Sequence, residues 1–312
     1  MHDRKGEGPP LIGTLPPGIA FPAMETSRIA WIGTGVMGRS MAGHLLASGH
    51  AVVVHTRTPE RAAALLEAGA TWAPSPRAAA DGADAACVMV GLPSDVEAVF
   101  LGDDGILAAP RCPRLLVDFT TSSPALARRI ASAAEAHGAL SLDAPVSGGD
   151  IGARNATLSI MCGGSPEAFA AAGPLLAKLG KTVVRQGGPG AGQHAKMVNQ
   201  ILIAGTMLGL AEALSYARRS GLDPATVLES VGGGAAASWS LANLAPRVLK
   251  GDFAPGFFIE HFVKDLRIAL DEARSLGLEL PTVAAAERAY AALAGGGHAR
   301  SGTQAIVHAY GW

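Results

Sequence analysis

The sequence predicts an α/β protein, in which an N-terminal domain with a doubly wound, mostly parallel sheet is followed by a C-terminal all-α domain. Three observations predict this class. Short apolar runs alternate with helical segments up to about residue 186, which is typical of βαβ units. A glycine-rich turn follows the first apolar run at once. Beyond residue 190 the chain has only long segments of helical periodicity.

The strands of the first domain are predicted from short apolar runs that are bounded by turn residues. They cover residues 28–32, 51–55, 85–90, 115–118, 139–143, 157–162 and 182–185. Helices are predicted at 41–48, 59–68, 125–137 and 166–179, and Gly49, Gly69 and Gly138 stand where the first three end. In the second half, apolar periodicity predicts helices at 193–220, 224–231, 239–249, 263–276 and 282–293.

The chain divides into three parts. Residues 1–26 hold five prolines, which interrupt any apolar run that export would need, so we expect a disordered leader or a mis-called start with translation from Met24. Residues 27–188 form the predicted dinucleotide-binding domain. Residues 189–312 form the predicted helical domain for substrate binding and oligomerisation. The glycine-rich stretch 187–190 marks the boundary.

Composition excludes several classes of protein. A net charge of −1 argues against nucleic acid or an anionic membrane as a partner. The apolar stretch 201–217 contains Glu212 and Ser215, so we interpret it as a buried core helix rather than a membrane span. The three cysteines lack metal-ligand spacing, so no metal site and no disulfide framework is expected. Reduced, buried thiols fit a cytoplasmic protein.

A phosphate-binding turn is predicted at Gly33-x-Gly35-x-x-Gly38, with Val36 and Met37 between the last two glycines. The motif follows a strand and opens a helix, which is the Rossmann arrangement. The first glycine allows the tight turn, the second admits the pyrophosphate, and the third lets helix and strand pack closely. The helix N-terminus then offers N–H groups to the phosphates.

The end of the second strand indicates which nicotinamide cofactor binds. NAD enzymes usually carry Asp or Glu there, but this chain has Arg57 and Thr58, with no carboxylate until Glu60. Arg57 would attract a 2′-phosphate, so NADP(H) is predicted to be preferred over NAD(H). Alternatively, Arg57 stacks on adenine and both cofactors bind. Leu92 and Pro93 are expected in a loop that covers the cofactor's ribose.

A candidate for the chemistry lies just beyond the boundary, in the segment GAGQHAKMVNQ at residues 190–200. Helical spacing puts Lys196, Asn199 and Gln200 on one face. Lysines are usually solvated surface residues. The neighbours of Lys196 are apolar, however, and the helix begins where two domains meet, which is a preferred place for ligand clefts.

Four separated segments resemble the β-hydroxyacid dehydrogenase family, which includes 3-hydroxyisobutyrate dehydrogenase, tartronate semialdehyde reductase and the glyoxylate/succinic semialdehyde reductases. The resemblance covers about residues 28–307. Its segments are IGTGVMG at 32–38, DAPVSGG at 143–149, GQHAKMVN at 192–199, and GDFAPGF at 251–257 leading to KDL at 264–266.

The resemblance implies roles for individual residues. Lys196 would be the general acid/base, with its pKa lowered by partial burial. Ser147, Gly148 and Gly149 would hold the substrate carboxylate. Further roles are a place near the nicotinamide for Thr121, a cofactor contact for Lys264, and pocket-lining positions for Phe257 and Asp265. Many members have asparagine four residues after the lysine. This chain has Gln200 there, so the substrate contact falls to either Asn199 or Gln200.

The sequence therefore predicts an NADP(H)-dependent oxidoreductase that interconverts a short β-hydroxy acid and its aldehyde or keto acid. Two alternatives stay open: an imine reductase of related fold, which generally lacks the lysine, and a non-catalytic cofactor-binding protein. The substrate is expected to be a small carboxylate. By analogy with the family, the helical domain is expected to form a homodimer or homotetramer.

Overall fold

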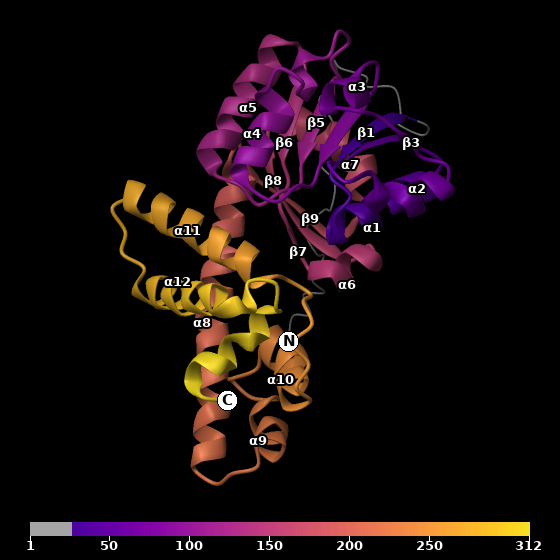
Figure 1. Cartoon of the computed structure of the whole chain (residues 1–312). Helices are drawn as coiled ribbons and strands as arrows, with labels where there is room; N and C mark the ends of the chain where they lie inside the picture. Colours follow the sequence, from indigo (N-terminus) through magenta and orange to yellow (C-terminus); the bar gives the residue numbers. More distant parts are fainter. Residues whose placement is uncertain (1–26) are drawn as a thin grey trace, which may run out of the picture.

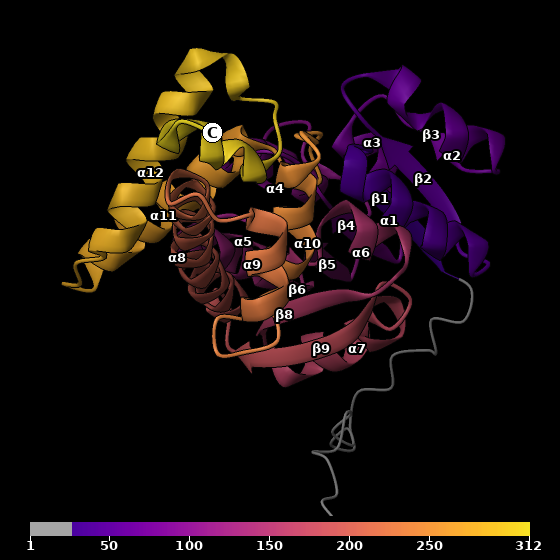
Figure 2. The ribbon, with the colours of Figure 1, turned by 90° about the horizontal axis from the view of Figure 1, so that it is seen from below.

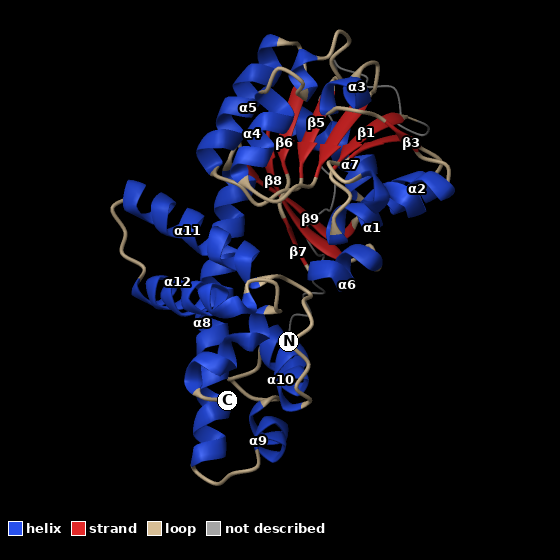
Figure 3. Cartoon of the chain, viewed as in Figure 1, coloured by secondary structure: helices blue, strands red, loops and turns tan. Residues whose placement is uncertain are grey.

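The computed structural model describes residues 27–312, so the predicted leader at 1–26 lies outside the described residues. The described chain has a sheet-bearing half and a helical half (Figure 1). Figure 3 shows the strands gathered in the first half and helices building the second. The predicted fold class is confirmed.

The first half alternates strands with helices, as the apolar runs predict. Its elements are β1 (Arg28–Ile32), α1 (Val36–Ala47), β2 (Ala51–His55), η1 (Pro59–Ala62), α2 (Ala63–Glu67), β3 (Thr71–Trp72), α3 (Pro76–Ala80), β4 (Ala85–Val88), α4 (Pro93–Leu101), η2 (Ile106–Ala108), β5 (Leu115–Asp118), α5 (Pro124–Ala136), β6 (Leu140–Asp143), β7 (Val146–Ser147), α6 (Gly149–Arg154), β8 (Leu158–Gly164), α7 (Pro166–Leu176) and β9 (Gly180–Gly187).

One nine-stranded sheet contains these strands in the order β3-β2-β1-β4-β5-β6-β8-β7, with β9 paired to β8. The first six strands are parallel in the Rossmann order. The pairings of β8 with β6 and with β7 are antiparallel. The alternation of strands and helices did not predict this reversal. Only residues 148–157 join β7 to β8, a shorter connection than the dozen or more residues that a parallel crossover needs.

Alternate residues of β1 face opposite sides of the sheet. Ile29 and Trp31 join one core, while Ala30 and Ile32 join the other. Both faces are covered, which explains why the strand is a continuous apolar run. Cys87 and Cys162 are buried as predicted, and burial raises the pKa of each thiol to about 12.

The helical half is built around one long helix. Its elements are α8 (Ala191–Arg219), α9 (Pro224–Val231), α10 (Trp239–Leu249), α11 (Ile259–Ser275), α12 (Pro281–Leu293), η3 (Ala294–His298) and η4 (Thr303–Tyr310). α8 packs against α10, α11, α12 and η4, and its first turns pack against β8, β9 and α5. Figure 2 shows α11 and α12 on one side of α8, with α9 and α10 on the other.

α8 is also the one described helix that is long and apolar enough to cross a membrane. Helices of the same chain pack against it, and 44% of its most apolar stretch is buried. Outside the sheet, the described chain has an isolated antiparallel bridge between Phe258 and Gly302. This bridge joins the start of α11 to the segment before η4.

Candidate active site

The glycine turn has the geometry that the motif predicts. Gly33 has a φ of +98°, and a Cβ there would lie 2.1 Å from the carbonyl oxygen of Met89. A Cβ on Gly38 would lie 2.1 Å from the carbonyl oxygen of Gly33, so the third glycine does let α1 approach the strand. The Trp31 indole N–H donates to the same Gly33 oxygen at 2.9 Å and fixes the turn.

Two features around Gly35 fit a bound dinucleotide. A Cβ on Gly35 would meet nothing within 4 Å, and no side chain caps the N-terminus of α1 behind it. Neighbouring Thr34 has a buried hydroxyl oxygen without a hydrogen-bond partner. Both residues line a cleft of about 1140 Å³, together with Val36, Met37 and Gly38. Free N–H groups and an unpaired hydroxyl at a helix N-terminus suit a pyrophosphate.

The loop after β2 supplies the other end of this cleft. Arg57 and Thr58 line it, as does Arg61. The Arg57 side chain is 82% exposed and its Nη1 lies 3.1 Å from Asp95 Oδ1. Leu92 and Pro93 do not belong to the cleft lining in the described chain, because Pro93 already begins α4. Gly91 and Asp95 line the cleft instead.

The helical half closes the cleft from the opposite side, through residues that the sequence did not predict. Phe258, Glu260, His261 and Arg300 all line it. Arg300 lies over the Phe258 ring at 4.8 Å and pairs with Glu260 at 3.3 Å. Burial, and then the charge of Lys264, lower the pKa of His261, so the imidazole favours its neutral form. No local sequence pattern marks these residues, because they line the same cleft as the turn at Gly33 only through the way in which the two halves meet.

Lys196 is buried on the second turn of α8, with 6% of its surface exposed. Its Nζ donates a 2.8 Å hydrogen bond to the carbonyl oxygen of Val146 on β7. Burial lowers the pKa of Lys196 from 10.5 to about 8; Asp265 opposes this shift and the charge of Lys264 adds to it. A lysine titrating near neutral pH can give or take a proton under physiological conditions.

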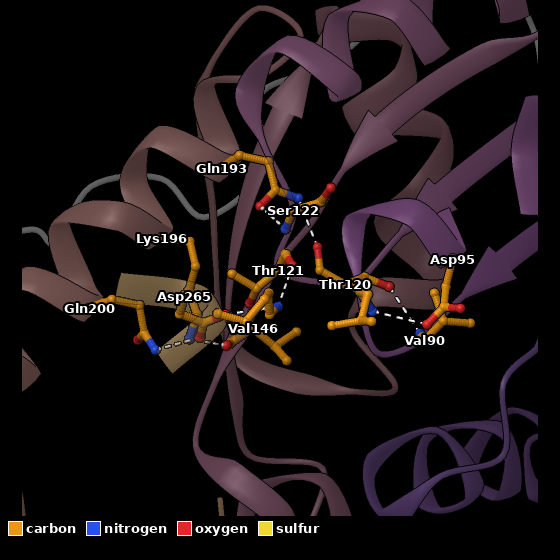
Figure 4. A network of polar contacts seen from close by, with 12 residues as sticks. Val90, Asp95, Thr120, Thr121, Ser122, Val146, Gln193, Lys196, Gln200 and Asp265 are labelled. Carbon is orange, nitrogen blue, oxygen red and sulfur yellow. Dashed lines mark hydrogen bonds and ion pairs between the residues drawn. The ribbon is translucent and has the colours of Figure 1, made fainter. Parts of the chain in front are cut away.

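A network of polar side chains lies beside the lysine, and Figure 4 shows Gln200 and Asp265 of this network near Lys196. Gln200 Nε2 donates to Asp265 Oδ2 at 2.7 Å, and Asn199 Nδ2 donates to Gln200 Oε1 at 2.7 Å. Lys264 Nζ lies 2.8 Å from Asp265 Oδ1 and donates to the carbonyl oxygen of Thr121 at 2.6 Å. α11 thus brings Asp265 to Gln200, and the charges of Asp265 and Lys264 act on Lys196.

The segment Ser147–Gly149 continues directly from Val146, the lysine's acceptor. Gly148 and Gly149 have φ values of +131° and +60°, which side-chain-bearing residues rarely adopt. The turn leads from β7 into α6 and faces the helical half, since a Cβ on Gly149 would lie 3.7 Å from the oxygen of Gly256. Phe257, the next residue, packs against the Phe262 ring at 5.9 Å and belongs to the edge of the helical core.

Two buried residues, to which the sequence assigned no role, join these parts. Asp143, at the end of β6, accepts the N–H groups of Gly190 and Gln193 at 2.7 and 2.9 Å and so anchors the start of α8. The Gln193 side chain donates to Thr120 O and accepts from Ser122 N, which fixes the loop that contains Thr121 (Figure 4). Both residues lie inside the motif segments, and a polar residue among buried positions is the signal that marks them.

Comparisons with known proteins agree with this geometry. Residues 28–188 match the family model described as the NAD binding domain of 6-phosphogluconate dehydrogenase. Residues 190–310 match the model described as NAD-binding of NADP-dependent 3-hydroxyisobutyrate dehydrogenase.

Similar proteins span nearly the same length. The uncharacterized oxidoreductase YkwC of Bacillus subtilis is 51% identical over 89% of this chain and 96% of its own. The 2-hydroxy-3-oxopropionate reductase of Escherichia coli is 38% identical over 90% of this chain and 96% of its own. The structure of Mycobacterium tuberculosis 3-hydroxyisobutyrate dehydrogenase with L-serine superposes with a TM-score of 0.82 at 32% identity, covering 91% of this chain and 98% of that one.

Proposed function

Because this chain belongs to the β-hydroxyacid dehydrogenase family of nicotinamide-dependent oxidoreductases, we propose that it interconverts a short β-hydroxy acid and its aldehyde or keto acid, using NADP(H). The observation that carries this proposal is the buried Lys196, with a pKa of about 8, beside the turn at Ser147–Gly149, which is suited to a carboxylate. Relatives that share most of the length of this chain are named as a reductase and a dehydrogenase of such carbonyl or hydroxyl groups.

Lys196 is the general acid/base of the proposed reaction. In reduction its ammonium group donates a proton to the carbonyl oxygen of the substrate. In oxidation its neutral amine accepts the hydroxyl proton. The Val146 oxygen holds the amine at rest, and Asp265 stabilises its charged form. The nicotinamide cofactor, when bound, supplies or accepts the hydride.

The substrate carboxylate is proposed to bind at Ser147–Gly149. Consecutive glycines with positive φ leave main-chain N–H groups uncovered, and the Ser147 hydroxyl can add a donor. The Asn199 side chain is the better candidate for the remaining substrate contact, because Gln200 is buried and already holds Asp265. This choice favours one of the two residues that the sequence left open.

The decisive test replaces Lys196 with methionine, which fills a similar volume without a proton to give. We expect turnover of 3-hydroxy acids and aldehyde acids to fall by at least about 10²-fold, with cofactor binding kept. The matched control is Lys181→Met on exposed β9, which should leave the rate unchanged. A Lys196→Met enzyme with a loss well under 10²-fold would show that another group transfers the proton.

The same assay separates the alternatives. An imine reductase would reduce cyclic imines faster than any aldehyde acid in a panel of C2 to C6 substrates. A non-catalytic cofactor-binding protein would bind NADPH and turn over neither class.

The preference for NADP(H) rests on Arg57, whose exposed guanidinium lines the cleft after β2. Arg57→Asp should raise the KM for NADPH on the order of tenfold or more and leave that for NADH nearly unchanged. Arg129→Asp, a change at an exposed arginine outside the cleft lining, is the control. An unchanged ratio of the two KM values would contradict a 2′-phosphate contact.

A further inference from the structure

A carboxylate enters the cofactor cleft beside Arg57, although β2 ends without one. Asp95 comes from the first turn of α4, 38 residues further along the chain. Its Oδ1 lies 3.1 Å from Arg57 Nη1, and both residues line the cleft. The cleft therefore presents a paired arginine, not a free one, at the place where a 2′-phosphate is expected.

The two partners of this ion pair differ in how firmly they are held. The Asp95 side chain is 20% exposed, and its Oδ2 accepts the main-chain N–H of Leu92 at 3.1 Å. A Cβ on Gly91 would lie 3.3 Å from the same oxygen, so the loop closes against the carboxylate. Arg57 is 82% exposed and can turn away. The negative charge is thus held at the cleft wall by the Leu92 N–H, while the positive charge lies on a mostly exposed side chain.

The other charges in the cleft do not neutralise Asp95. Glu260 is paired with Arg300 on the helical side of the cleft. Arg39 and Arg61 line the cleft, as do Asp103 and Asp104, so the remaining lining charges balance one another in number. Arg57 is the one cation among the described residues that forms an ion pair with Asp95. Binding of a dianionic phosphate at Arg57 must therefore displace Asp95 or lie next to its charge.

We propose that Asp95 is a specificity-determining residue, which weakens the binding of NADP(H) relative to NAD(H) by occupying Arg57 and by repelling the 2′-phosphate. The proposal rests on the cofactor site of the proposed function. It implies that Asp95, which lies on α4 and not at the end of β2, reduces the preference for NADP(H) that Arg57 gives. Like charges within a few ångströms in water change affinity modestly, and salt weakens the effect.

The test measures cofactor binding directly, without turnover. Asp95→Asn removes the charge and keeps an oxygen that can accept the Leu92 N–H. Dissociation constants for NADPH and NADH are measured by fluorescence titration of the enzyme without substrate. We expect NADPH to bind roughly three- to tenfold more tightly and NADH to change less than about twofold. The gain for NADPH should shrink as ionic strength rises.

Glu97→Gln is the matched control, because Glu97 also lies on α4 and pairs with an arginine, Arg129, but outside the cleft lining. It should change neither constant. Asp95→Ser removes the charge with a smaller side chain and should reproduce the shift if Asp95→Asn folds poorly. Circular dichroism and thermal melting identify a folding defect.

Two results would overturn the proposal. One is an unchanged NADPH-to-NADH ratio in both Asp95 variants. The other is a ratio that changes only because NADH binds more weakly, which would make Asp95 an acceptor for the ribose hydroxyl. Failure of the proposed function is distinguishable from these. Arg57→Asp tests the phosphate contact itself, whereas the Asp95 variants test only the charge opposing it.

Discussion

Oxidation of the hydroxy acid should follow the deprotonation of Lys196. Burial lowers the pKa of this residue from 10.5 to about 8. At pH 7.5 a lysine with a pKa of 8 is neutral in about a quarter of molecules, whereas one with a pKa of 10.5 is neutral in roughly one in a thousand. Burial thus raises the population of the proton-accepting form by a factor of about 200. The larger population of neutral Lys196 comes from burial alone and needs no change in the proton-transfer step.

The pH dependence of kcat/KM in each direction measures this effect. For oxidation, kcat/KM should rise about tenfold per pH unit below pH 8 and level off above it. For reduction, it should be level below pH 8 and fall above it, because the ammonium form is then the reactant. Asp265→Asn removes the carboxylate that raises the pKa of Lys196, so the break should move to lower pH in both directions.

Three results would refute the reasoning. A profile without a break between about pH 6.5 and 9.5 would mean that Lys196 does not limit the rate. A break that persists in Lys196→Met would mean that another group titrates. A break shifted upward by Asp265→Asn would reverse the assigned sign of the electrostatic contribution.

Three other predictions concern the turn, the sheet and the assembly. Gly35→Ala should fold normally and bind NADPH about tenfold more weakly, because its Cβ would enter open space in the cleft. Gly33→Ala should instead lower the melting temperature, because its Cβ would meet the carbonyl oxygen of Met89. Burial raises the pKa of Asp118 from 3.8 to about 7, so folding stabilises its protonated form and the free energy of unfolding should fall as pH rises from about 4 to 7. Asp118→Asn should reduce this slope and stabilise the protein at pH 7.5 by on the order of 1 kcal/mol in urea denaturation, and an unchanged slope would contradict the assignment. The chain should sediment as a homodimer or homotetramer, and Leu202→Glu, which changes a 68% exposed leucine of α8, should shift it toward monomer; a monomeric wild type would oppose the proposed assembly.

Local patterns predicted the elements that have strong end signals. The predicted bounds of α9 and α10 agree with the structure, and each helix begins after a side-chain cap, Asp223 or Ser238. β3 and β7 were missed because two-residue strands leave no pattern to read. α4 was missed because Pro93, its first residue, and Leu92 before it were interpreted as a loop.

In the candidate site, too, the sequence predicted some residues but not the contacts between distant parts of the chain. Gly33 could be predicted from the sequence because the spacing of its motif has a local physical cause. Lys196 was a candidate because of its apolar neighbours and its place between the domains, and the roles of Lys196 and Ser147 were implied by the resemblance to the family. The contacts of Lys264 with Thr121, 143 residues away, and of Gln193 with Thr120, 73 residues away, could not be predicted. Those pairs depend on which strand ends meet at one edge of the sheet and on where α11 crosses it.

The resting contact of Lys196 is made to the main chain rather than to a side chain. No exchange of residue at position 146 removes a peptide oxygen, and that oxygen never changes its protonation. Lys196, the proposed acid/base group, therefore keeps its hydrogen-bond acceptor when the side chains around it are replaced by larger or smaller ones. Substitutions that fit the pocket to longer or bulkier acids would then leave the proposed proton-transfer step unchanged.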